Sequence, residues 1–84
     1  MTIQPFITSF RDSTSVHIYF FPGRDERGSS TARMTFLTTV TDYKYVRHSD
    51  GSIEYIFSDN VPSQITYRIQ NISTGVSENK VLRL

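Results

Sequence analysis

Hydrophobic and polar residues alternate along much of this 84-residue chain, and this alternation predicts β-strands. The pattern is clearest in residues 31–40 and 64–70, where most alternate positions are apolar. Such a period is typical of antiparallel strands that bury one face and leave the other in water. The inward positions expected in these two strands are Ala32, Met34, Phe36, Val40, Ile65, Tyr67 and Ile69.

Residues 43–57 are predicted to form a β-hairpin, because Asp50-Gly51 separates two runs rich in Tyr, Val and Ile. Two registers fit. A two-residue loop would pair Arg47 with Glu54, whereas a three-residue loop over 49–51 with a bulge at Gly51 would pair Tyr45 with Tyr55. We favour the second, since it gathers the large apolar side chains on one face. These side chains are Tyr43, Tyr45, Ile53, Tyr55 and Phe57.

The remaining segments are less uniform. Residues 3–10 read as a strand, but Pro5 cannot donate to a ladder and so favours an edge or a bulge. Residues 15–21 are apolar on both faces, which indicates a strand covered on both sides. Residues 77–84 fit either a strand or a short helix with Ser77 as its N-cap.

Together these elements predict one mainly β domain over residues 1–84. We expect an antiparallel meander of five or six strands, as an open sheet or a small barrel, with at most a short C-terminal helix. A strand that is apolar on both faces needs a second layer. The sheet itself, the C-terminal segment or another chain could supply it.

Composition narrows the possible chemistry. There is no cysteine, the net charge is +1, and Arg outnumbers Lys seven to two. Thiolate sites are thereby excluded, and bulk charge does not require nucleic acid or acidic lipid. No apolar run approaches the roughly 18–20 residues that span a bilayer. The composition is compatible with an intracellular protein that does not insert into membranes, and a homodimer is compatible with it as well.

No catalytic signature is present. His17 and His48 lie on different predicted strands without an acidic pair at ligand spacing, and the carboxylates are scattered. We therefore predict a protein that is not an enzyme and holds no cofactor or metal. The sequence favours a protein partner that adds a strand to an exposed sheet edge, with residues 64–70 or the hairpin as the template.

One alternative is a small sheet protein that binds single-stranded nucleic acid, although the near-neutral charge counts against it. Its stacking platform would combine rings with arginines. These residues would be Tyr43, Tyr45, Tyr55, Phe57, Arg33, Arg47 and Arg68. A second alternative is an inhibitor of another macromolecule, of the type that phage genomes encode.

The order of segments over about the first two-thirds of the chain resembles the photosystem II assembly-factor family known as subunit twenty-eight. That family opens with Ile-Gln-Phe, continues through a Val-x-Leu strand into an Arg-Asp-Gly loop, and then has Gly-Thr-Ala-x-Phe-x-Phe and Tyr-x-x-x-x-Glu-Gly-x-Ile. The family's long C-terminal helix has no counterpart here. The matching residues are Ile3, Gln4, Val16, Ile18, Arg24, Asp25, Ser30, Thr31, Ala32, Met34, Phe36, Tyr45, Asp50, Gly51 and Ile53.

This resemblance implies a peripheral protein on the cytosolic or stromal face of the thylakoid. It would dock transiently on a photosystem II assembly intermediate, by strand addition with tails of core subunits. The partner-binding residues we expect are Arg24 and Asp25 in the charged loop, and Arg33, Arg47 and Arg68 on strand faces.

Overall fold

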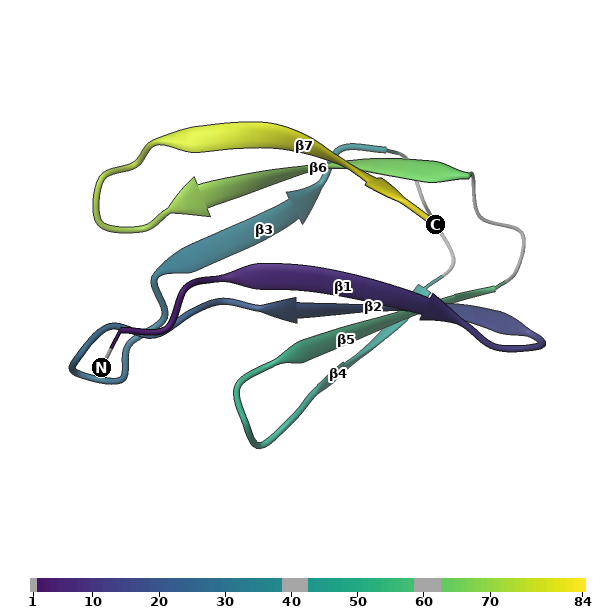
Figure 1. Cartoon of the computed structure of the whole chain (residues 1–84), viewed down its shortest axis with the longest axis horizontal. Helices are drawn as coiled ribbons and strands as arrows, with labels where there is room; N and C mark the ends of the chain where they lie inside the picture. The colour runs from purple at the N-terminus through teal and green to yellow at the C-terminus, as the bar shows by residue number, and fades with distance from the viewer. Residues whose placement is uncertain (1, 39–42, 59–62) are drawn as a thin grey trace.

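The computed structural model describes residues 2–38, 43–58 and 63–84, and this part of the chain forms seven antiparallel strands and no helix (Figure 1). Short stretches of alternating and β-branched residues account for the strands. They are β1 (Phe6–Arg11), β2 (Ser15–Phe21), β3 (Ala32–Phe36), β4 (Tyr43–Arg47), β5 (Ile53–Ser58), β6 (Gln64–Asn71) and β7 (Ser77–Arg83).

The strands form two open sheets, one with the order β1-β2-β5-β4 and one with the order β3-β6-β7. Three hairpins, β1–β2, β4–β5 and β6–β7, are joined by connections that pass from one sheet to the other. The prediction of a mainly β, antiparallel chain with an open sheet is confirmed. The structure adds one strand to the expected number and divides the strands between two layers.

The C-terminal segment supplies much of the second layer. Residues 77–83, for which a short helix was one of two expectations, pair with β6 along seven positions as β7. The turn before β7 is closed by the side-chain amide oxygen of Asn71, which accepts from the backbone N–H groups of Ser73 and Thr74 at 2.9 and 3.0 Å. Pairing with β6 satisfies the backbone hydrogen bonds of this segment, whereas a helix of this length would be only marginally stable, so the strand is favoured.

The core lies between the sheets. Val16, Ile18 and Phe57 from the four-stranded sheet and Ile65 from β6 are almost fully buried. Phe36 of β3 meets the opposite sheet edge-on, with its ring centroid 4.9 Å from that of Tyr55 and 5.6 Å from that of Phe57. Such edge-to-face pairs are favourable beyond the area they bury.

The β4–β5 hairpin has the register we favoured. Tyr45 pairs with Tyr55 and Tyr43 with Phe57, and the loop comprises residues 49–51. The His48 N–H donates to the Ser52 carbonyl at 2.9 Å, and Gly51 has a φ of +91°. Glycine is required there because this left-handed conformation strains other residues.

Three expectations need correction or fall outside the structure. The strand at residues 64–70 is wrong as a template for partner pairing, because β6 lies between β3 and β7 and both its edges are occupied. The outer face of β2, expected to be covered, is only half-buried. Val40 lies outside the described residues.

Candidate functional site

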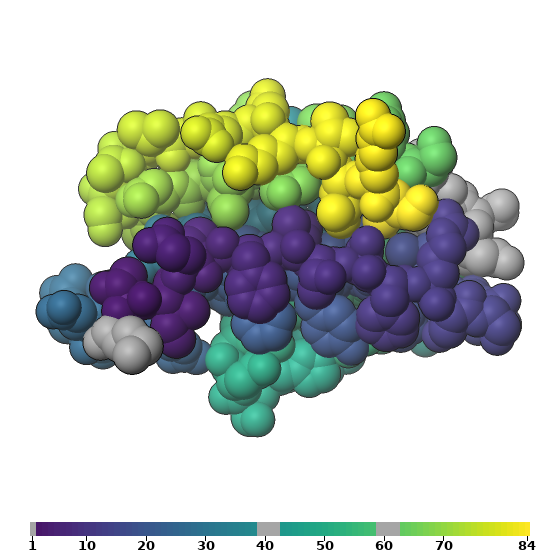
Figure 2. All heavy atoms as spheres, in the orientation of Figure 1, coloured from purple at the N-terminus to yellow at the C-terminus, as the bar shows by residue number. Residues whose placement is uncertain are grey.

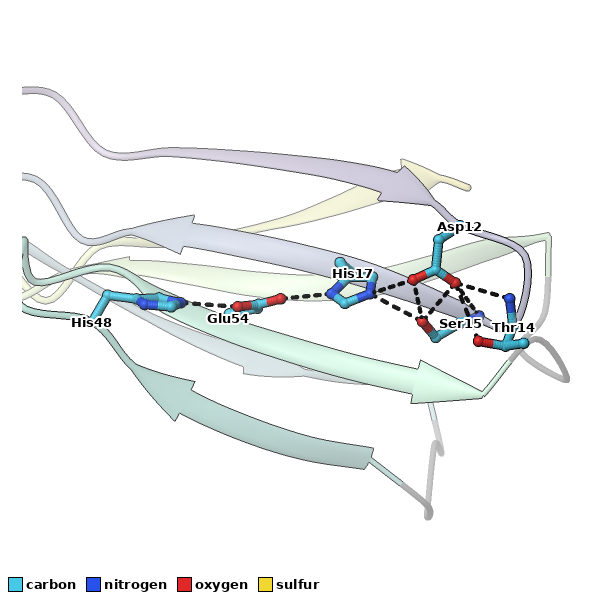
Figure 3. A network of polar contacts seen from close by, with 6 residues as sticks. All are labelled: Asp12, Thr14, Ser15, His17, His48 and Glu54. Atoms are coloured by element: carbon cyan, nitrogen blue, oxygen red, sulfur yellow. Dashed lines mark hydrogen bonds and ion pairs between the residues drawn. The ribbon is translucent and has the colours of Figure 1, made fainter.

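A chain of polar contacts crosses the outer face of the four-stranded sheet, from the β1–β2 turn to the β4–β5 turn (Figure 3). His17 Nδ1 lies 2.6 Å from Glu54 Oε2, and His17 Nε2 lies 3.0 Å from Asp12 Oδ2. His48 Nε2 lies 2.9 Å from Glu54 Oε1. His17 therefore lies between two carboxylates, and the Glu54 carboxylate lies between two imidazoles.

Strand pairing creates this arrangement. Tyr19 pairs with Glu54 and His17 with Ile56 across β2 and β5, so Glu54 is the diagonal neighbour of His17 on the same face. Glu54 is only 8% exposed. A carboxylate so nearly buried needs hydrogen-bond partners, and the two histidines supply them.

The opposite end of the network closes the β1–β2 turn. One oxygen of Asp12 accepts from the backbone N–H groups of Thr14 at 2.8 Å and Ser15 at 2.7 Å. These bonds, led by the one from Thr14, hold the pKa of Asp12 far below its ordinary value, because they favour the charged carboxylate. Asp12 is therefore negatively charged at neutral pH.

The electrostatics of the network favour a charged His17. The hydrogen bond to Glu54 raises the pKa of His17, and the hydrogen bond and charge of Asp12 act in the same direction. The contact with His17 likewise lowers the pKa of Glu54. The Phe10 ring stacks on the imidazole at 4.6 Å, an arrangement that suits a delocalised cation.

Ser15, His17 and Glu54 have the connectivity of a serine-hydrolase triad, since Ser15 Oγ lies 3.0 Å from His17 Nε2. Asp12 changes the chemistry of this group. Both oxygens of Asp12 lie 2.9 Å from Ser15 Oγ, so the hydroxyl proton of Ser15 points to Asp12. In addition, when His17 Nε2 donates its proton to Asp12, it cannot take a proton from the serine. The nearby backbone N–H groups that could stabilise an oxyanion also donate to Asp12. The geometry therefore suits a structural role for this group of side chains in closing the β1–β2 turn.

A second candidate feature is the outer edge of β4, which is the last strand of its sheet. His48 and Ser52 form a hydrogen-bonded pair, and along an antiparallel ladder such pairs alternate with pairs that are not hydrogen-bonded. The N–H and C=O groups of Tyr43, Tyr45 and Arg47 therefore point away from β5. All five residues of β4 are exposed, and Tyr45 is 60% exposed. This edge is a row of backbone groups available to another strand.

An open groove of about 410 Å³ runs beside this edge, between β4 and the edge strand β3. Five of its seven lining residues are aliphatic or aromatic, and the other two are threonines. Phe36, Tyr43 and Tyr55 contact one another across it, with ring centroids 4.9 to 5.9 Å apart. The lining residues are Met34, Thr35, Phe36, Leu37, Thr38, Tyr43 and Tyr55.

A larger hollow of about 620 Å³ lies between the N-terminal segment and the β6–β7 hairpin, with Pro5 in its wall. Its lining includes Glu78 and Lys80, whose charged atoms lie 3.8 Å apart. Figure 2 shows the side of the molecule on which β1 and β7 (purple and yellow) face the viewer. Of the two hollows, the groove beside β4 combines a strand edge with an aromatic lining.

The charged loop that we expected to contact a partner makes contacts within the chain. The Arg24 guanidinium donates to the carbonyl of Gly28 at 3.2 Å and to that of Asp50 at 3.1 Å, so it links this loop to the hairpin turn. Asp25 accepts from the backbone N–H groups of Arg27 and Ser29, both at 2.9 Å. The bond from Ser29 leads in lowering the pKa of Asp25.

The three strand arginines do not share one surface. Arg33 pairs with Gln70 and Arg68 with Thr35, so these two arginines are diagonal neighbours on the outer face of the three-stranded sheet. Arg47 pairs with Ile53 at the edge of the other sheet. Since Tyr55 and Phe57 pack inward, the rings and arginines proposed as a platform for nucleic acid are divided among separate surfaces.

The fold and these surfaces define a small antiparallel two-sheet β protein. The described residues include no cluster of His, Cys, Asp and Glu arranged to hold a metal ion. Nor do they include a helix with the length and hydropathy needed to cross a bilayer. Comparison of the chain with protein-family models, with curated proteins and with solved structures gives no match.

Proposed function

We propose that this chain is a protein-interaction module that adds an extended segment of a partner to the outer edge of β4. The observation that carries this proposal is the outer edge of β4 at Tyr43, Tyr45 and Arg47, which pairs with no described strand and lies beside an aromatic groove. A partner strand would bond to the outward backbone groups, and its inward side chains would reach the groove.

The energetics suit a reversible contact. At about 0.5–1.5 kcal/mol net for each ladder hydrogen bond, the outward groups of β4 give modest affinity on their own. An apolar side chain in the groove between Phe36 and Tyr43 would add burial and specificity. Backbone pairing is tolerant of sequence, so the groove is the part that would select the partner.

Selection of extended peptides from a random library, followed by hydrogen exchange on the complex, tests the proposal. Peptides that use this edge should protect the amides of Tyr43, Tyr45 and Arg47, which face away from β5 in the free protein. Tyr45→Pro should weaken those peptides at least about tenfold, because proline removes one outward N–H and is tolerated on an edge.

Two control variants separate edge pairing from other effects. Tyr45→Thr removes the same ring but keeps the N–H, and Asn79→Pro removes an outward N–H from the edge of β7. Both should retain the selected peptides more strongly than Tyr45→Pro does. Equal loss with Asn79→Pro, or protection that excludes β4, would contradict the proposal.

The resemblance of the first two-thirds of the chain to photosystem II assembly factors supports a narrower proposal. The partner segment would be a tail of a photosystem II core subunit, bound on the cytosolic or stromal side of the thylakoid. Affinity capture from thylakoids tests it, with the Tyr45→Pro variant as the control. Recovery of no photosystem II subunit would overturn the narrower proposal and leave the edge experiment as the test of the broader one.

A further inference from the structure

The outer face of the three-stranded sheet concentrates positive charge without any acidic residue. Register places Arg33, Arg68 and Arg83 on this face, and all three are exposed. The face therefore has a formal charge of +3, and the rest of the chain has −2, because the whole chain has +1. Its other members are Thr35, Gln64, Thr66, Gln70, Ser77, Asn79 and Val81.

The surroundings of these arginines keep their guanidinium groups available. Arg68 Nε donates to Asn79 Oδ1 at 3.2 Å, a contact between neighbouring strands that orients the side chain without neutralising it. Among the described residues, the ion pairs formed by arginine side chains include only that of Arg27 with Asp25, which lies in a distant loop. A face of this kind is complementary to negative charge.

We propose that this face, called here the basic face, binds an acidic extended segment of a protein partner. Arginine suits this role because its guanidinium can accept a carboxylate in a bidentate pair. Arg33 and Arg68 are diagonal neighbours, close enough to act on one acidic side chain or on two adjacent in space. Arg83 pairs with Gln64, four residues along β6 from Arg68, and four residues of an extended chain span about 13 Å.

Protein is favoured over nucleic acid by the chemistry of the face. Binding of single strands commonly depends on aromatic rings on which bases stack, and the basic face has none among its members. The near-neutral chain also lacks the long-range field that draws in a polyanion. Isolated carboxylates on a partner need only the local pairs that the arginines provide.

The basic face borders the groove beside β4, because Thr35 belongs to the face and also lines the groove. This inference rests on the proposed function only for the class of partner, which is a protein. Binding to the basic face does not require the edge of β4, so the two proposals can fail separately.

Titration of the ¹⁵N-labelled full chain with a hexaglutamate peptide, at low salt, tests this inference. We expect amide shifts concentrated on β3, β6 and β7, and a loss of binding when salt is raised. The double variant Arg33→Gln with Arg68→Gln should weaken binding at least about tenfold, since two charge-assisted contacts are removed.

Arg27→Gln is a control for the loss of arginine charge elsewhere on the chain, because it removes one positive charge, half of the change in the double variant, from a side chain that is 86% exposed in the loop. It should change the affinity less than about twofold, and Tyr45→Pro should leave hexaglutamate binding unchanged. Shifts spread evenly over the molecule, or equal weakening by Arg27→Gln, would overturn the proposal. Tighter binding of oligothymidylate to the same amides would overturn the choice of a protein segment.

Discussion

Glu54 Oε2 lies 2.6 Å from His17 Nδ1, although the two residues are 37 positions apart in the chain. The contact joins the central strands β2 and β5, and Asp12 and His48 extend it to the turns at the two ends of the sheet. It is the most concentrated set of titratable groups on the described surface. The stability of the sheet should therefore depend on pH in a way that can be assigned to named residues.

We predict that the protein is more stable near pH 6 than near pH 9. The pKa of His17 is raised above its ordinary value of 6.5 by Glu54 and Asp12. The stabilisation from the charged imidazole is complete below that ordinary value, and it is lost as the pH rises through the raised pKa of the folded state. Urea unfolding at the two pH values and NMR titration of the His17 ring measure these effects.

The control for this prediction is His17→Gln, which should flatten the decline in the free energy of unfolding between pH 6 and pH 9. On the acid side, the pKa values of Glu54 and Asp12 are lowered, so their contribution is lost as the pH falls below the ordinary carboxyl range. A ring titration with its midpoint below 6.5 would contradict the assignment of His17.

Glu54→Gln should lower the free energy of unfolding by about 1–3 kcal/mol, because the amide keeps the size of the side chain but removes the charge that two histidines contact. The same change should lower the pKa of His17. Glu78→Gln is the matched control. The Glu78 side chain is 68% exposed and lies 3.8 Å from Lys80, so its loss should cost less than about 0.5 kcal/mol. Similar losses in both variants would refute a special role for Glu54.

Gly51→Ala should destabilise the hairpin by more than Gly28→Ala. Both glycines have positive φ, at +91° and +82°, so alanine is strained at either position by about 1–2 kcal/mol. A Cβ at Gly51 would also collide with the Arg24 guanidinium, whereas at Gly28 it would meet no atom within 4 Å. Arg24 would have to move and give up its bond to the Asp50 carbonyl.

A double-variant cycle tests that explanation. In a background of Arg24→Ala, the cost of Gly51→Ala should fall by about 0.5–1.5 kcal/mol, the contribution of a hydrogen bond of this kind. Thermal or urea unfolding of the four proteins gives the coupling. If the cost of Gly51→Ala is the same with and without Arg24, the collision does not determine it.

Local patterns in the sequence predicted the local parts of this fold. Asp50-Gly51 and the alternation around it were enough for the hairpin and its register, because turn geometry and one apolar face are both encoded within 15 residues. The division into two sheets depends on which distant strands pair. Several segments have nearly the same alternation of apolar and polar residues, and this alternation does not determine which strands pair. The pairing of β2 with β5 could therefore not be predicted from the sequence.

The candidate site shows the same limit. His17, Glu54 and Asp12 come together only because β2 pairs with β5 and the β1–β2 turn closes beside them. Ser15 and His17 share a strand face, and this i,i+2 spacing was the one local signal for part of the network. Arg33 and Arg68 were chosen from the sequence as exposed strand residues, but their proximity follows from the pairing of β3 with β6.

Ile65→Ala tests whether the two sheets form one cooperative unit. Ile65 is fully buried and is the member of the central cluster that the three-stranded sheet contributes, so its truncation should cost about 2–5 kcal/mol. Val81→Ala, on the outer face of the same hairpin and 54% exposed, should cost less than about 1 kcal/mol. If the interior is shared, Ile65→Ala will reduce hydrogen-exchange protection in β2 and β5 by the same free energy as in β6. Loss of protection confined to β3, β6 and β7 would instead show that the four-stranded sheet is stable without its cover, in which case Phe36 and Ile65 stabilise only their own layer.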